Sequence, residues 1–65
     1  MDPFALFLED DQGPIWRQDC ADLDEANRKG QDLANREGLP CFIFSFRDCT
    51  QLGRFEPKAG EHMSH

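Results

Sequence analysis

The sequence predicts an α+β domain of two layers, in which a four-stranded antiparallel sheet carries one helix on one face. One stretch has helical periodicity with a start signal and a stop signal. Two pairs of short apolar runs flank it, and a cluster of turn residues joins the members of each pair. The element order is therefore strand, strand, helix, strand, strand (ββαββ). A right-handed crossover that skips one strand brings the third strand beside the first, which gives the strand order 2-1-3-4.

The first two strands are expected over residues 4–9 and 15–20, with residues 10–14 as a five-residue loop between them. In the first strand, alternation places Leu6 and Leu8 on one face and Phe7 on the other. The second strand is more polar, which suits an edge strand, because charges there discourage pairing with other sheet edges.

The helix is expected over residues 23–37. Asp22 can cap its first turn, and Glu25 three residues later completes a pattern resembling a capping box. Gly38 fits the left-handed position that follows a helix, and Pro40 prevents the helix from continuing.

The apolar stripe of this helix consists mostly of small side chains. Its members are Leu23, Ala26, Gly30, Leu33 and Ala34. A mid-helix glycine costs about 1 kcal/mol relative to alanine, so Gly30 indicates that the helix lies close to the sheet. Phenylalanines on the strands would then fill the layer beneath the small helix residues.

The second hairpin is expected over residues 41–47 and 51–55, with a turn at residues 48–50.

Residues 1–56 would form a single domain. Residues 57–65 contain a proline, a glycine and few apolar side chains, and we expect them to be a disordered tail.

The two most apolar strands carry largely apolar side chains on both faces, although one helix can cover only one face of the sheet. The third strand has Phe42, Phe44 and Phe46 on one side, and Cys41, Ile43 and Ser45 on the other. We predict that the phenylalanines face the helix, although the inverse assignment remains open. On this prediction Phe7, Trp16 and Ile43 line the uncovered face, where an apolar patch indicates an interface, either of a homodimer or with another protein.

The charge of −6 is concentrated in the first 25 residues, which hold eight acids and one base. Such a surface repels phosphate, so nucleic acid and anionic membranes are disfavoured as partners. The alternative function is an acidic module that engages a basic protein or mimics nucleic acid. Its expected acidic patch comprises Glu9, Asp10, Asp11, Asp19, Asp22, Asp24 and Glu25.

No catalytic or metal-ligating pattern stands out. The cysteines Cys20, Cys41 and Cys49 lack C-x-x-C spacing, and the two histidines, His62 and His65, lie in the expected tail. A site that joins three cysteines to a histidine would need that tail to dock, so we expect no metal, no cofactor and no enzymatic activity.

The expected location is the cytoplasm with reduced thiols, because no signal peptide or membrane span is evident. The ββαββ layout is similar to that of several small bacterial domains without an assigned activity, and this architectural likeness transfers no site residues.

Overall fold

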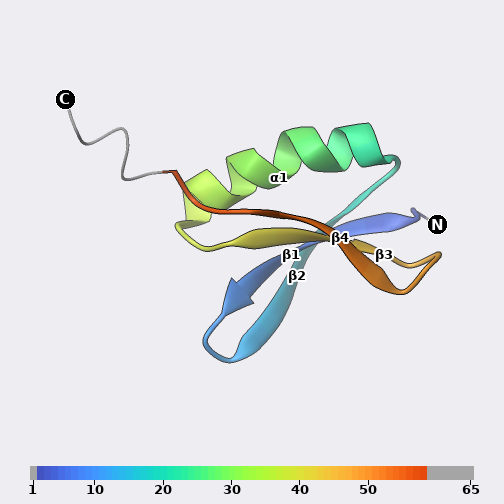
Figure 1. Cartoon of the computed structure of the whole chain (residues 1–65). Coiled ribbons are helices and arrows are strands. Elements are labelled where there is room, and N and C mark those ends of the chain that lie inside the picture. The colour runs from blue at the N-terminus through green and yellow to red at the C-terminus, as the bar shows by residue number, and fades with distance from the viewer. Residues whose placement is uncertain (1, 59–65) are drawn as a thin grey trace.

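The computed structural model describes residues 2–58 and confirms the predicted two-layer fold. The elements are β1 (Phe4–Asp10), β2 (Gly13–Cys20), α1 (Leu23–Glu37), β3 (Cys41–Ser45) and β4 (Thr50–Phe55). All neighbouring strands are antiparallel, and their order is β2-β1-β3-β4. Helix α1 lies across one face of this sheet, and the far end of the β1–β2 hairpin extends away from the helix (Figure 1).

The core lies between α1 and the two central strands. Leu6 pairs with Ile43 and Leu8 with Cys41, so these side chains share the helix-facing side of the sheet. All four are at most 1% exposed, and they pack with small residues of the helix. The most apolar strands thus occupy the centre of the sheet, where both of their edges are paired.

Both ends of α1 follow the sequence signals. The Asp22 side chain accepts from the backbone N–H of Glu25 at 2.8 Å, and the Glu25 side chain accepts from the N–H of Ala21 at 2.9 Å. Gly38 has φ 72°, a left-handed conformation that glycine adopts without the steric cost of a Cβ, and its N–H donates to the carbonyl of Ala34.

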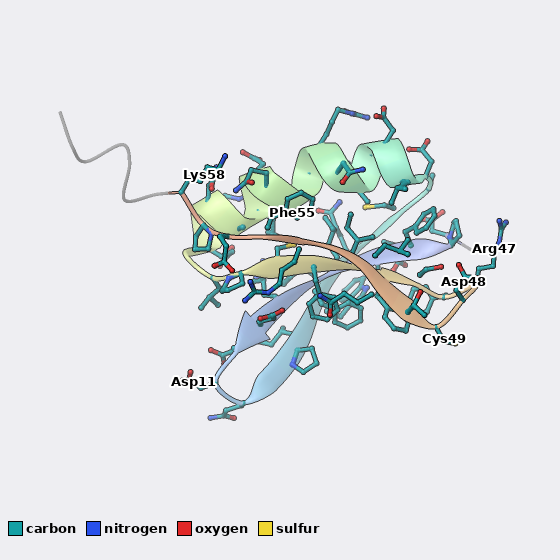
Figure 2. The ribbon with its side chains drawn as sticks, viewed as in Figure 1. Asp11, Arg47, Asp48, Cys49, Phe55 and Lys58 are labelled. Atoms are coloured by element: carbon teal, nitrogen blue, oxygen red, sulfur yellow. The ribbon has the colours of Figure 1, made fainter. Side chains whose placement is uncertain are left out.

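Gly30 permits the close approach that its position predicts. A Cβ built there would lie 2.4 Å from Cε2 of Phe55, far inside van der Waals contact. Phe55 extends from β4 toward α1, as Figure 2 shows. The ring that fills the layer against the helix is therefore Phe55. Leu23, assigned to the buried stripe, is instead 42% exposed at the first position of the helix.

The first hairpin is tighter than expected. Strand pairing continues to Asp10 and Gly13, so Asp11 and Gln12 alone form the turn, and the five-residue loop was wrong. Gly13 has φ 115°, a conformation that side chains strongly disfavour. Pro14 fits within β2 because that strand is an edge, where a missing N–H costs no ladder hydrogen bond.

Each edge strand contains an irregularity. In β2 the register shifts so that Arg17 is an extra residue, and in β4 the extra residue is Leu52. Bulges of this kind disrupt a strand edge and discourage uncontrolled pairing with other chains. Arg17 also reaches Glu37 of α1, with 3.6 Å between Nη2 and Oε2.

The second hairpin differs from the prediction at its turn. Strand β3 ends at Ser45, two residues before the expected position, and residues 46–49 connect it to β4. The chain after β4 contacts α1, because the Lys58 N–H donates to the Asn35 side chain and the Glu56 carbonyl accepts from Gln31. The expected disordered tail falls mainly on residues 59–65, which lie outside the described residues.

Candidate functional site

The surface of most interest is the side of the sheet that faces away from α1, here called the open face. Strand pairing places four residues on it in one cross-strand row, from β2 to β4: Trp16, Phe7, Phe42 and Arg54. A second row, read in the same direction, contains Asp19, Ala5, Phe44 and Gln51. Phenylalanines and Ala5 thus occupy the middle of the open face, and its edges carry Trp16 and three polar side chains, Asp19, Gln51 and Arg54.

Three phenylalanines, Phe7, Phe42 and Phe44, form a continuous cluster there, and a fourth, Phe46, extends it. The rings of Phe7 and Phe42 are stacked, with centroids 5.3 Å apart and planes 6° from parallel. Phe44 meets Phe7 edge-on at 6.1 Å, and Phe46 meets Phe44 edge-on at 5.4 Å. These are favourable aromatic geometries, each worth about 0.5–1.5 kcal/mol beyond area burial. The cluster therefore has a fixed shape although no layer formed by residues 2–58 covers it.

Two aromatic side chains on this side are strongly exposed. Trp16 is 54% exposed, and its Nε1–H donates to Oδ1 of Asp19 at 3.0 Å. Phe46, just beyond β3, is 46% exposed. Phe7, Phe42 and Phe44 are half-buried, mostly by one another and by the neighbouring strands.

A charged group borders the cluster at the start of β3. The Arg54 guanidinium donates to both carboxylate oxygens of Glu9, at 3.0 and 2.9 Å, and it also pairs with Glu56. The hydrogen bond from Arg54 lowers the pKa of Glu9, and the two carboxylates raise the pKa of Arg54. The positive charge of Arg54 is thus balanced within the chain, and the group of Arg54, Glu9 and Glu56 keeps one negative charge.

The structure corrects the face assignment of β3. Ile43 is 1% exposed and belongs to the helix-facing core, so its predicted place on the open face is wrong. Phe42 and Phe44, expected to face the helix, instead contact Phe7 on the open face. The reason is register: β1 presents its leucines to the helix, and pairing of Leu6 with Ile43 assigns Ile43 to the same side.

Phe7 and Trp16 do lie on the open face, opposite one another across the β1–β2 pair. Sequence reasoning missed Phe42, Phe44, Phe46 and Arg54 as members of this surface. The sequence showed that the three phenylalanines share a side, but the side itself depends on a pairing register between strands 30 residues apart.

The structure does not bring the predicted acidic residues into one patch. Asp10 and Asp11 lie at the tip of the β1–β2 hairpin, whereas Asp19 lies near the other end of β2, before the helix (Figure 2 labels Asp11). Several of these carboxylates already serve this chain: Glu9 pairs with Arg54, Asp19 accepts from Trp16, Asp22 caps α1, Asp24 pairs with Arg28 and Glu25 pairs with Lys29.

The cysteines are dispersed. Cys20 and Cys41 are buried in the helix-facing core as free thiols, and burial raises the pKa of Cys41 to about 11. Burial also raises the pKa of Cys20, and the nearby Glu25 carboxylate adds to this effect. Cys49 is exposed in the β3–β4 turn, where its φ of 56° is left-handed (Figure 2).

Within residues 2–58 there is no group of three potential metal ligands and no pocket. His62 and His65, considered above as weak metal ligands, lie outside the described residues. In the same described part of the chain, no helix is both long and apolar enough to span a membrane.

Comparison with known proteins found no matching family model, no similar curated protein and no similar solved structure.

Proposed function

We propose that this chain is a small non-enzymatic protein that works by associating through its open face, with a second copy of itself or with another protein. The observation that carries the proposal is the ordered cluster of Phe7, Phe42 and Phe44, flanked by the exposed rings of Trp16 and Phe46. Contiguous exposed apolar surface of this kind marks interaction sites, and aromatic residues supply much of the binding energy at interfaces.

The geometry of the cluster favours binding. Each ring is held by a stacked or edge-on neighbour, so little side-chain freedom remains to be lost when a partner covers it. Phenylalanine and tryptophan also have only two side-chain torsions, which lowers the entropic cost further. The bordering Arg54–Glu9 pair is already formed, so the charged edge need not find new partners on association.

A second candidate function is an acidic module for a basic partner. Asp10 and Asp11 favour it, because both are exposed at the hairpin tip and neither makes an ion pair within residues 2–58. Such binding would weaken steeply with salt. Association through aromatic surface would persist, because apolar burial does not depend on charge screening.

A cytoplasmic location is part of the proposal. Its support is that Cys20, Cys41 and Cys49 are all free thiols, a state that reducing compartments maintain.

The test is the absolute mass in solution by light scattering, across a concentration series in a thiol reductant, at low and at high salt. The matched variants are Trp16→Ser, on the open face, and Leu23→Ser, which removes an apolar side chain of similar exposure from α1. We expect wild type and Leu23→Ser to dimerise at both salt concentrations and Trp16→Ser to need at least ten times more protein.

A monomer at every concentration would rule out self-association. Affinity capture by the wild type but not by Trp16→Ser, with the captured protein identified and its direct binding reproduced in purified form, would then support the open face as a site for another protein. If dimerisation disappears in high salt, or if Leu23→Ser weakens it as much as Trp16→Ser, the open face is not the interface.

A further inference from the structure

We infer that two copies of this chain pack open face to open face about a two-fold axis that runs along the strands, between β1 and β3. The inference rests on the proposed function, and it adds the partner and the orientation. Its basis is the order of side chains along the two cross-strand rows of the open face. Rotation about this axis places each row against the same row of the second copy, read in the opposite direction.

The first row is complementary to its own reverse. Its two central residues, Phe7 and Phe42, would each face the other in the second copy, which joins two stacked ring pairs into one aromatic layer. At the edges, Trp16 would face Arg54 of the second copy. A guanidinium favours the face of a tryptophan ring, and it can stack there while its N–H groups remain bonded to a carboxylate such as Glu9.

The second row adds one complementary pair. Phe44 would lie opposite Ala5 of the second copy, but Ala5 is 0% exposed within its own chain, so this pair contributes no contact. Asp19 would face Gln51, a hydrogen-bond acceptor opposite a donor. The reversed order therefore matches ring with ring or cation in the first row, and acceptor with donor at the edges of the second row.

The alternative two-fold axis lies across the strands. If it passed through the first row, each residue of that row would face its own copy, so Arg54 would meet Arg54 and Trp16 would meet Trp16. Like charges that face each other disfavour a pairing. The axis along the strands avoids this contact and gives two identical cation–aromatic pairs instead.

Area and charge support a second copy as the occupant. A standard interface takes about 800 Å² from each partner, less than a fifth of the accessible surface of 4430 Å². One broad face of a two-layer domain can supply that share. The centre of the open face carries no ionisable group, and Arg54 offsets one of the two carboxylates beside it, so the aromatic centres of two chains of charge −6 can meet without direct charge repulsion.

Cross-linking between variants that each carry one exposed cysteine tests the orientation. The two variants are Asp19→Cys and Gln51→Cys, because both positions are exposed and lie on opposite edges of the sheet. Both are made in a Cys49→Gly background, which removes the exposed native cysteine. Cys20 and Cys41 remain, since both are buried. Facing sheets lie about 10 Å apart, which exceeds disulfide reach, so a short bis-maleimide is used. One variant carries a mass label, the two are mixed, and the products are measured by mass spectrometry.

We expect the Asp19→Cys/Gln51→Cys heterodimer to exceed either cross-linked homodimer by at least fivefold. A predominant Asp19→Cys homodimer, formed from chains that light scattering shows to be dimeric, would overturn the orientation and leave the proposed function intact. Absence of cross-linking together with a monomeric mass would overturn both the orientation and self-association. A third test compares Arg54→Gln with the control Arg28→Gln on α1. If Arg54 faces Trp16 of the second copy, Arg54→Gln should weaken dimerisation and Arg28→Gln should not.

Discussion

Replacement of Gly30 by alanine should destabilise this protein, although the same change stabilises most helices. At an ordinary helix position, Gly→Ala contributes about 1 kcal/mol of stability through backbone entropy. Gly30, however, lies directly over the ring of Phe55. The new Cβ would lie 2.4 Å from Cε2 and 2.7 Å from Cδ2 of that ring, whereas carbon atoms pack at about 3.5–4.0 Å.

The ring or the helix must therefore move by about 1 Å, and neither can do so freely. Phe55 packs against the core beside its strand neighbour Cys41, and the buried residues of α1 belong to the same core cluster as Leu6 and Leu8. Overpacking of this kind costs about 1–3 kcal/mol. After the propensity gain is subtracted, we expect Gly30→Ala to lower the free energy of unfolding by about 1 kcal/mol, which corresponds to about 4–8 °C in Tm for a domain of this size.

Urea unfolding followed by circular dichroism measures this change. The control is Asn27→Ala, an exposed position on the same helix where only propensity changes, and it should raise stability slightly. The double variant Gly30→Ala/Phe55→Leu should lose less stability than the sum of its parts, because the smaller side chain makes room for the Cβ. If Gly30→Ala stabilises the protein by about 1 kcal/mol, the close contact between helix and sheet is refuted.

Four further experiments test other parts of the fold. Cys49→Gly should raise the free energy of unfolding by about 0.5–1 kcal/mol in urea titrations, because φ at this position is 56°, and an equal or lower stability would contradict that reading. Arg54 lowers the pKa of Glu9 in the folded chain, so the pair stabilises the fold above about pH 4.5, and this stabilisation is lost as the pH falls through the folded pKa. Glu9→Gln should reduce the loss of stability at acid pH. An unchanged dependence of stability on pH would argue against the pair. Burial raises the pKa of Cys41 to about 11, from an ordinary value of 9.0. The thiol therefore ionises first in the unfolded chain, and the free energy of unfolding should fall as the pH rises from about 9 toward 11. In Cys41→Ala this fall should be smaller. A thiol reagent at neutral pH should label Cys49 quickly and Cys20 and Cys41 only after unfolding, and fast labelling of all three would contradict their burial.

Most of the fold could be predicted from local sequence signals. The caps at Asp22 and Gly38 set the helix bounds, because each residue satisfies backbone groups within a few positions of itself. The strand order followed from handedness and from the short connections, which leave few topologies for two hairpins around one helix.

Local sequence signals could not predict which side of the sheet carries the apolar residues of each strand. Alternation identifies two sides for β3, but only pairing with β1 decides which side meets the helix, and a shift of one residue exchanges them. The small stripe at Gly30 suggested that phenylalanines of β3 would fill the space beneath the helix. Phe55 fills it instead, and Phe42 and Phe44 remain on the open face.

The turns were misjudged for a related reason. Asp10 and Gly13 are typical loop residues, yet they continue the strand pairing, because tight hairpins tolerate a glycine with positive φ at the strand end. The bulges at Arg17 and Leu52 have no sequence signature, and they determine which side the edge residues Trp16 and Gln51 occupy.

The most direct test of association through the open face is the fluorescence of Trp16, the one tryptophan of the chain, measured together with mass over a dilution series. Trp16 is 54% exposed in the single chain, so a partner on the open face must cover it. We expect its emission to shift to shorter wavelength, and its quenching by acrylamide to decrease, at the concentrations where light scattering shows the dimer to form. A dimer that forms while the emission and quenching of Trp16 stay unchanged would place the interface elsewhere and contradict the proposal.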